Sequence, residues 1–203
     1  MICSTVPHIM PDTEDASLTK ARQRALCLAA RRGLPSDKRA EYSTMICRFL
    51  SAMPELQTAR TILSYLAAPD EADLSAFHAR ARVRSVTLAF PFAEGRGVMR
   101  AMIPRGEDAL AAGRYGIMCP IPERSDIAVP EALDAVLIPC VGFDHRGGRL
   151  GHGAGYYDRY LPLCPRALRI LIAFDMQRVE HVIRDAHDID IPVIVTELGI
   201  HRV

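Results

Sequence analysis

Hydrophobic positions along the chain fall into short runs that alternate with longer segments of helical spacing. The short runs are rich in β-branched and other apolar residues, which predicts buried strands at residues 61–66, 85–91, 98–103, 135–141, 168–174 and 193–195. Helices are predicted at residues 17–32, 39–53, 72–82, 107–115 and 155–161. Alternating strands and helices are typical of a parallel sheet covered on both faces. We therefore expect a single three-layer α/β/α domain over residues 17–203, with a largely parallel sheet and N-terminal helices.

Turn-forming residues set several of the predicted boundaries. Gly33 and Pro35 end the first helix, Ser36 is placed to cap the second, and Pro54 closes it. Residues 1–16 begin without Lys or Arg, contain no long apolar stretch, and carry acidic residues near their end. We expect them to be a disordered lead-in rather than a secretory signal.

Composition narrows the class of protein without identifying its chemistry. At 203 residues, with 49% hydrophobic and 24% charged, the chain can fill one globular core. Its 25 basic and 24 acidic residues almost cancel, which gives no reason to expect a nucleic-acid or membrane partner. No apolar stretch approaches the roughly 20 residues that span a bilayer. The cysteines form no Cys-x-x-Cys pair, so buried free thiols in a reducing cytoplasm are expected.

The segment after the strand at 135–141 carries the clearest functional signal. Arg149 precedes the pattern Gly151-x-Gly153-x-Gly155, and a helix is predicted to follow. In an open α/β sheet, ligands bind at the carboxyl ends of strands, where such loops emerge. Glycines let backbone N–H groups converge on phosphate oxygens, and the arginine and the helix dipole add positive charge. The pattern is neither a Walker loop nor a Rossmann fingerprint, but it predicts a phosphate site.

A glycine-rich turn can also be only a turn, so the residues that follow it decide between the two interpretations. Tyr156 and Tyr157 come next, and aromatic rings at this place suit stacking on a planar heterocycle. Asp158 lies one turn into the predicted helix, where a carboxylate suits Mg²⁺ bound to nucleotide phosphates. Together these neighbours favour a ligand site.

The same segment closely resembles the signature of the 5-formyltetrahydrofolate cyclo-ligases, also called methenyltetrahydrofolate synthetases. That signature reads Pro-Gly-x-(Ala/Gly)-Phe-Asp, followed by Arg-Leu-Gly-x-Gly-x-Gly-Tyr-Tyr-Asp. Here it stands at residues 139–144 and 149–158, and the resemblance covers nearly the whole chain after the lead-in. Three positions depart from the family pattern, namely Cys140, His152 and Ala154. His152 can be neutral near pH 7, which could weaken phosphate binding or make it pH-dependent.

The resemblance also implies roles for residues far from this segment. Family members carry Lys-x-x-x-Arg on the first helix, here Lys20 and Arg24, and the i, i+4 spacing puts both on one helix face. The implied ATP-binding residues are Lys20, Arg24, Arg149, Gly151, His152, Gly153, Ala154, Gly155 and Tyr156. The implied folate-binding residues are Leu66, Glu71, Tyr115 and Tyr157, and the implied Mg²⁺ ligands are Asp158 and Asp188.

Each of the remote residues also has an ordinary structural explanation. A Lys–Arg pair at helical spacing is usually a solvated face, and Glu71 could simply complement a helix dipole. Tyr115 could be a surface loop residue, and Asp188 could be a turn aspartate. The sequence also leaves open whether Tyr156 or Tyr157 faces the folate.

The resemblance implies a cytoplasmic enzyme that converts 5-formyltetrahydrofolate to 5,10-methenyltetrahydrofolate with ATP and Mg²⁺. Transfer of the γ-phosphoryl group would activate the formyl oxygen, and N10 would then close the ring, giving ADP and phosphate. The expected partners are these small molecules, with no nucleic acid and no membrane, and a monomer or weak dimer is expected. The rival interpretations are a non-catalytic nucleotide or RNA binder, and an enzyme for a sugar phosphate or coenzyme A derivative.

Overall fold

The computed structural model describes residues 19–95, 97–113, 116–185 and 188–203. The predicted lead-in, residues 1–16, and the predicted folate residue Tyr115 lie outside the described residues.

An eight-stranded sheet forms the centre of the domain. Its middle is parallel, with β2, β1, β7, β10 and β11 side by side in that order. Antiparallel strands close the two edges, β12 beside β11 and β3 and β6 beyond β2. The strands are β1 (Thr61–Leu63), β2 (Thr87–Gly95), β3 (Val98–Pro104), β6 (Ser125–Ile127), β7 (Ala135–Pro139), β10 (Leu168–Ile172), β11 (Val193–Thr196) and β12 (Gly199–Arg202).

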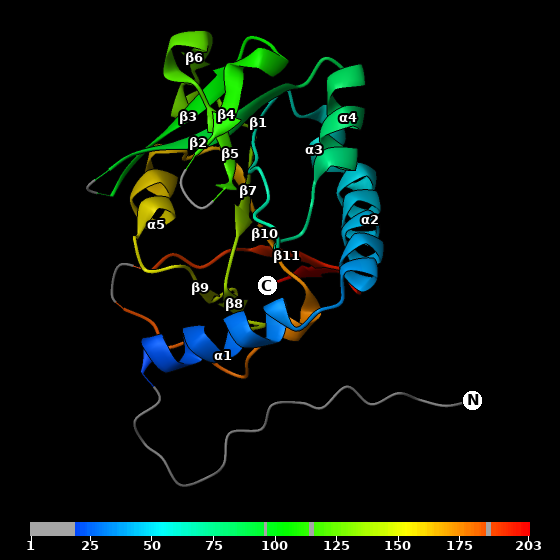
Figure 1. Cartoon of the computed structure of the whole chain (residues 1–203), viewed down its shortest axis with the longest axis vertical. Coiled ribbons are helices and arrows are strands. Elements are labelled where there is room, and N and C mark those ends of the chain that lie inside the picture. The colour runs from blue at the N-terminus through cyan, green and yellow to red at the C-terminus, as the bar shows by residue number, and fades with distance from the viewer. Residues whose placement is uncertain (1–18, 96, 114–115, 186–187) are drawn as a thin grey trace, which may run out of the picture.

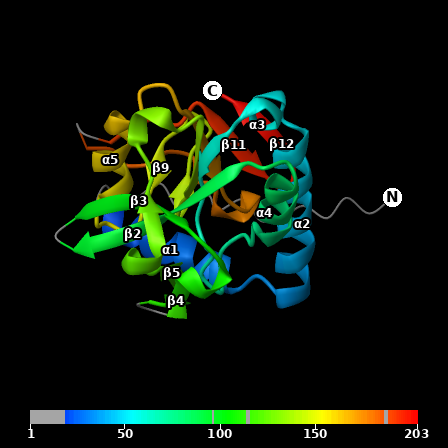
Figure 2. The same cartoon turned by 90° about the horizontal axis from the view of Figure 1, so that it is seen from above.

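Helices lie on both sides of this sheet. Figure 1 shows α2, α3 and α4 along one side, α5 on the opposite side, and α1 across the lower end of the molecule, and Figure 2 shows the same two flanks from above. The helices are α1 (Lys20–Arg32), α2 (Ser36–Ala52), α3 (Pro54–Thr58), α4 (Ser75–Val83) and α5 (Tyr156–Tyr160).

The alternation of side chains along the strands divides the core into two layers. On β1, Ile62 packs with the apolar residues of α2 and α4, whereas its neighbour Leu63 packs on the other face with Tyr160 and Leu161. Successive side chains of a strand point to opposite faces, so a strand covered on both sides must be apolar throughout. This arrangement confirms the predicted α/β/α fold with a largely parallel sheet.

Two local predictions are wrong. The helix predicted at residues 107–115 is replaced by a 3₁₀ turn, Glu107–Ala109, and by β4 (Leu110–Ala112), which pairs with β5 (Met118–Pro120). Helix propensity is a weak prior, and here the pairing of two strands overrides it. Ser36 does not cap α2, because Pro35 holds the cap position and Ser36 is already helical.

Two findings bear on the class of protein. The described cysteines are all free, four of them buried and Cys119 partly so, as expected. Within the described ranges, no helix combines the length and the apolar character needed to cross a bilayer.

Candidate active site

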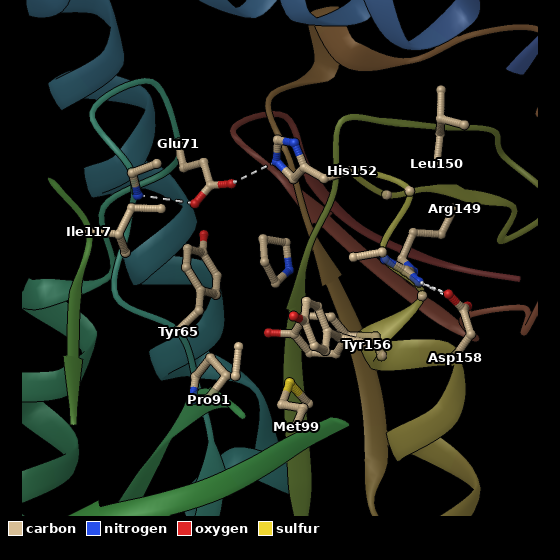
Figure 3. A pocket seen from close by; sticks show the side chains of 18 of the residues that line it. Tyr65, Glu71, Pro91, Met99, Ile117, Arg149, Leu150, His152, Tyr156 and Asp158 are labelled. Atoms are coloured by element: carbon tan, nitrogen blue, oxygen red, sulfur yellow. Dashed lines mark hydrogen bonds and ion pairs between the residues drawn. The ribbon is translucent and has the colours of Figure 1, made fainter. Parts of the chain in front are cut away.

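A cavity of 1630 Å³ opens where β1 and β7 end. One wall is α1, a second is the glycine-rich loop, and a third is the turn after β1, while Pro91, Met99 and Ile117 add apolar surface (Figure 3). Every predicted site residue within the described ranges lines this cavity, namely Lys20, Arg24, Leu66, Glu71, Arg149, Gly151, His152, Gly153, Ala154, Gly155, Tyr156, Tyr157, Asp158 and Asp188. Residues from both ends of the chain therefore meet in one place.

A buried carboxylate holds the base of the glycine-rich loop. The ribbon of β8 (Gly142–Phe143) and β9 (Arg149–Leu150) leads into the loop, and Asp144 in its turn has no exposed surface. The Asp144 carboxylate accepts hydrogen bonds from the backbone N–H groups of Arg146, Gly148 and Val182, each 2.9 Å long. Burial alone would raise the pKa of Asp144, but these backbone donors outweigh it and lower the pKa. Asp144 therefore anchors the turn.

Two glycines in this region have conformations that other residues rarely adopt. Gly147 has a φ of 83°, and a Cβ there would lie 2.5 Å from the backbone oxygen of Ile191. Gly153, in the loop itself, has a φ of 99°. Both positions need glycine for conformational reasons, and the second keeps the loop backbone free of side-chain bulk beside the cavity.

Arg149 and Asp158 form an ion pair inside the cavity. Nη2 of Arg149 lies 2.9 Å and 2.8 Å from the two carboxylate oxygens of Asp158, and the side chains are only 6% and 15% exposed (Figure 3). The guanidinium carbon also lies 5.6 Å from the ring centroid of Tyr157. Because β9 and the first turn of α5 carry the two partners, the pair fixes the ends of the loop relative to each other.

The two predicted cations of α1, Lys20 and Arg24, line the cavity. Nζ of Lys20 lies 2.6 Å from Asp185 and 2.5 Å from Asp188. Burial alone would lower the pKa of Lys20, but its hydrogen bonds to these two carboxylates outweigh the effect and raise the pKa. One turn along the helix, Nε of Arg24 donates a 2.8 Å hydrogen bond to the backbone oxygen of Gly151. The two cations therefore have different tasks, since one faces carboxylates and the other holds the loop.

Glu71 forms the opposite wall, in the turn after β1. Its Oε2 accepts a 3.1 Å hydrogen bond from the backbone N–H of Ala68, and its Oε1 lies 3.3 Å from Nη1 of Arg31. Nε2 of His152, on the glycine-rich loop, lies 3.8 Å from the same Oε1 (Figure 3). The Glu71 side chain is 11% exposed and that of His152 is 60% exposed. His152 thus reaches from the glycine-rich loop towards the carboxylate of Glu71.

Sequence reasoning missed two residues of this site, Arg31 and Tyr65. Arg31 is 2% exposed and bonds to both Asp70 and Glu71, and Tyr65 is buried in the cavity wall, where its hydroxyl donates to the backbone oxygen of Ala72. The missed signal for Arg31 is that it follows Arg24 by two helical turns, which puts it on the same face.

The two adjacent tyrosines, Tyr156 and Tyr157, both line the cavity. The Tyr157 hydroxyl is buried and has no hydrogen-bond partner among the described residues. Burial raises the pKa of Tyr157, and the nearby Glu71 carboxylate adds to the effect. An unpaired buried hydroxyl is costly, so a ligand that accepts or donates a hydrogen bond here would relieve that cost.

The charges of the cavity suit phosphates and a planar ligand with polar edges more readily than a metal held by protein alone. Among the described residues, no group of three or more His, Cys, Asp or Glu side chains could hold a metal ion. Asp158 and Asp188, the predicted Mg²⁺ ligands, each lie against a cation of the protein.

The sequence is similar to a known family over most of its length. The family model described as the 5-formyltetrahydrofolate cyclo-ligase family matches residues 16–197. The 5-formyltetrahydrofolate cyclo-ligase of Escherichia coli K12 is 29% identical over 173 residues, which are 82% of this chain and 93% of that protein.

Solved structures show the same fold. The NMR structure of Aquifex aeolicus 5,10-methenyltetrahydrofolate synthetase is 31% identical, with a TM-score of 0.79 over 90% of this chain and 92% of that one. The Mycoplasma pneumoniae synthetase, 22% identical, has a TM-score of 0.73 over 88% and 98% of the two chains and supports the fold alone. The matched range and this agreement show that the chain belongs to the 5-formyltetrahydrofolate cyclo-ligase family of enzymes.

Proposed function

We propose that this enzyme converts 5-formyltetrahydrofolate to 5,10-methenyltetrahydrofolate and couples the reaction to hydrolysis of ATP to ADP and phosphate. The observation that carries the proposal is one cavity with a cationic glycine-rich loop on one wall and the Glu71 carboxylate on another. Pockets for one drug-sized ligand measure about 300–1,000 Å³. A cavity of 1630 Å³ has room for a nucleotide and a folate side by side.

The chemistry requires activation of a poor leaving group. The γ-phosphoryl group passes from ATP to the formyl oxygen, and N10 attacks the activated carbon. The carbon–oxygen bond then breaks, phosphate leaves with that oxygen, and the N10 proton passes to solvent. Phosphoryl transfer is catalysed mainly by positioning and by stabilisation of charge, so the protein needs no covalent nucleophile.

The phosphates are assigned to the cationic side of the cavity. Arg149 supplies a charge that is 6% exposed, and low exposure strengthens its attraction for an anion. When ATP binds, Lys20 would release Asp185 and contact a phosphate oxygen instead. Arg24 would keep its hydrogen bond to the glycine-rich loop. The remaining predicted contacts come from the loop residues Gly151, His152, Gly153, Ala154, Gly155 and Tyr156, all of which line the cavity.

The folate is assigned to the opposite side. The Glu71 carboxylate can accept hydrogen bonds from the N–H edge of a pterin ring, and Leu66 offers apolar contact. Tyr157 is favoured over Tyr156 as the folate contact, because its buried hydroxyl lacks a hydrogen-bond partner among the described residues. Tyr115 stays a sequence-based prediction.

Mg²⁺ in nucleotide sites usually takes one or two carboxylates together with phosphate oxygens and water. The donor set fits a Mg²⁺ that arrives with ATP, with Asp158 and Asp188 as the carboxylates. Such an ion would neutralise charge on the phosphates. The expected setting is the cytoplasm, with small-molecule substrates alone and a monomer or weak dimer.

The test incubates the purified protein with (6S)-5-formyltetrahydrofolate, ATP and Mg²⁺ and follows the absorbance of the methenyl product. Product should form only with ATP, and Asp158→Ala should lose it. Asp126→Ala, which removes an exposed ion pair with Arg105, serves as the control and should keep full activity. ATP binding by calorimetry without any product would overturn the proposal and favour a non-catalytic binder or a different substrate.

A further inference from the structure

Arg31 is a buried cation whose three guanidinium nitrogens are all bonded. Nε and Nη2 donate to Oδ2 of Asp70 at 3.1 Å and 3.0 Å, and Nη1 lies 3.3 Å from Oε1 of Glu71. Nη1 also donates a 3.1 Å hydrogen bond to the backbone oxygen of Cys140. With 2% of its side chain exposed, Arg31 reaches no bulk solvent that could take over these bonds.

The three partners come from two separate parts of the site. Asp70 and Glu71 lie in the turn after β1, and Cys140 directly follows β7. Arg31 itself is on α1, seven residues after Arg24, which holds the glycine-rich loop. The guanidinium group of Arg31 on α1 therefore connects the turn that carries Asp70 and Glu71 to the end of β7. The same helix carries Lys20 and Arg24.

The geometry demands an arginine rather than a generic positive charge. A guanidinium donates in several fixed in-plane directions, whereas an ammonium group is a compact point charge on a flexible stem. Here Nη1 of Arg31 donates to one oxygen of the Glu71 carboxylate, and the backbone N–H of Ala68 donates to the other. The result is a carboxylate with little rotational freedom at the cavity surface.

We propose that Arg31 is the positioning residue for folate binding, because it fixes the orientation in which Glu71 presents its carboxylate to the substrate. The inference rests on the proposed function. It places the effect of Arg31 on the folate and not on the nucleotide, because the contacts of Arg31 are with the Glu71 side of the cavity. Binding of a ligand by a carboxylate held in advance costs less entropy than binding by a mobile one.

The experiment measures kcat and KM for each substrate in Arg31→Met and Arg31→Lys. Loss of a hydrogen bond to a charged group weakens binding by about tenfold or more, so the folate KM should rise by that factor. The ATP KM should change by less than about twofold. Arg31→Lys keeps the charge that compensates the two carboxylates, so it remains informative where Arg31→Met fails to fold. Arg105→Met is the control and should leave both KM values unchanged, because Arg105 is 58% exposed and its ion pair with Asp126 is not part of the cavity lining.

A double-mutant cycle separates positioning through Glu71 from a general structural effect. In a Glu71→Gln background, Arg31→Lys should raise the folate KM by less than about twofold further, since the interaction it supports is already lost. Equal effects of Arg31→Lys in both backgrounds, or parallel rises in both KM values, would overturn the inference. A wild-type protein that forms no methenyl product would instead overturn the proposed function, so the two failures are distinguishable.

Discussion

His78 should make this protein lose stability in mild acid. The imidazole is buried between Phe77 and Phe90, with ring centroids 6.2 Å and 5.3 Å away, and it shares a 2.7 Å hydrogen bond with the hydroxyl of Ser64. Burial, together with the nearby Arg82 charge, lowers the pKa of His78 to about 4. The folded protein therefore resists a proton that the unfolded chain accepts at a pKa of about 6.5.

The sign and size follow from proton linkage. Between pH 6.5 and pH 4 the unfolded chain binds more protons than the folded one, so the free energy of unfolding falls as the pH falls. At pH 5.5 the unfolded histidine is about ten-elevenths protonated and the folded one is almost neutral. The resulting loss between pH 8 and pH 5.5 is RT ln 11, or about 1.4 kcal/mol, from this one residue.

The assay compares urea unfolding of the wild type and His78→Gln at pH 8, 6.5 and 5.5. Glutamine keeps a polar partner for Ser64 but does not titrate, so the variant should lose about 1.4 kcal/mol less than the wild type over this range. His201→Gln, at an exposed site, is the control for removing an imidazole. Parallel losses in the wild type and His78→Gln would refute the reasoning, because they would show that His78 titrates equally in both states.

Three further changes test the site and its supports. Arg149→Lys should raise the ATP KM by about tenfold, because an ammonium cannot keep both contacts to Asp158 and a phosphate; steady-state kinetics at saturating folate checks this. Asp144→Asn should lower the free energy of unfolding by about 2 kcal/mol or more at pH 7, measured in urea, with the wild type approaching the variant as the pH falls through the lowered pKa of Asp144. Gly147→Ala should lower the thermal midpoint by several degrees, since its φ is 83° and the new Cβ would meet the backbone oxygen of Ile191; an unchanged midpoint would contradict this.

Much of the sheet and the centre of the site could be predicted from local sequence patterns. β7, for example, is apolar on both faces, so its burial between two layers follows from its composition. The glycine-rich loop could also be predicted, because its glycines, its arginine and the tyrosine pair are adjacent in the chain. Lys20 and Arg24 could be placed on one face because four residues make about one helical turn.

Which distant side chains meet depends on how the segments pack against one another. The burial of Arg31 depends on two carboxylates about 40 residues away and on a backbone oxygen still farther along the chain, so no local pattern distinguishes it from the exposed Arg32. The predicted helix at 107–115 failed for the same reason, because strand pairing with β5 outweighs weak local propensity. Contacts between segments are set by how the chain packs, whereas helical spacing, apolar runs and loop glycines are local properties that sequence carries directly.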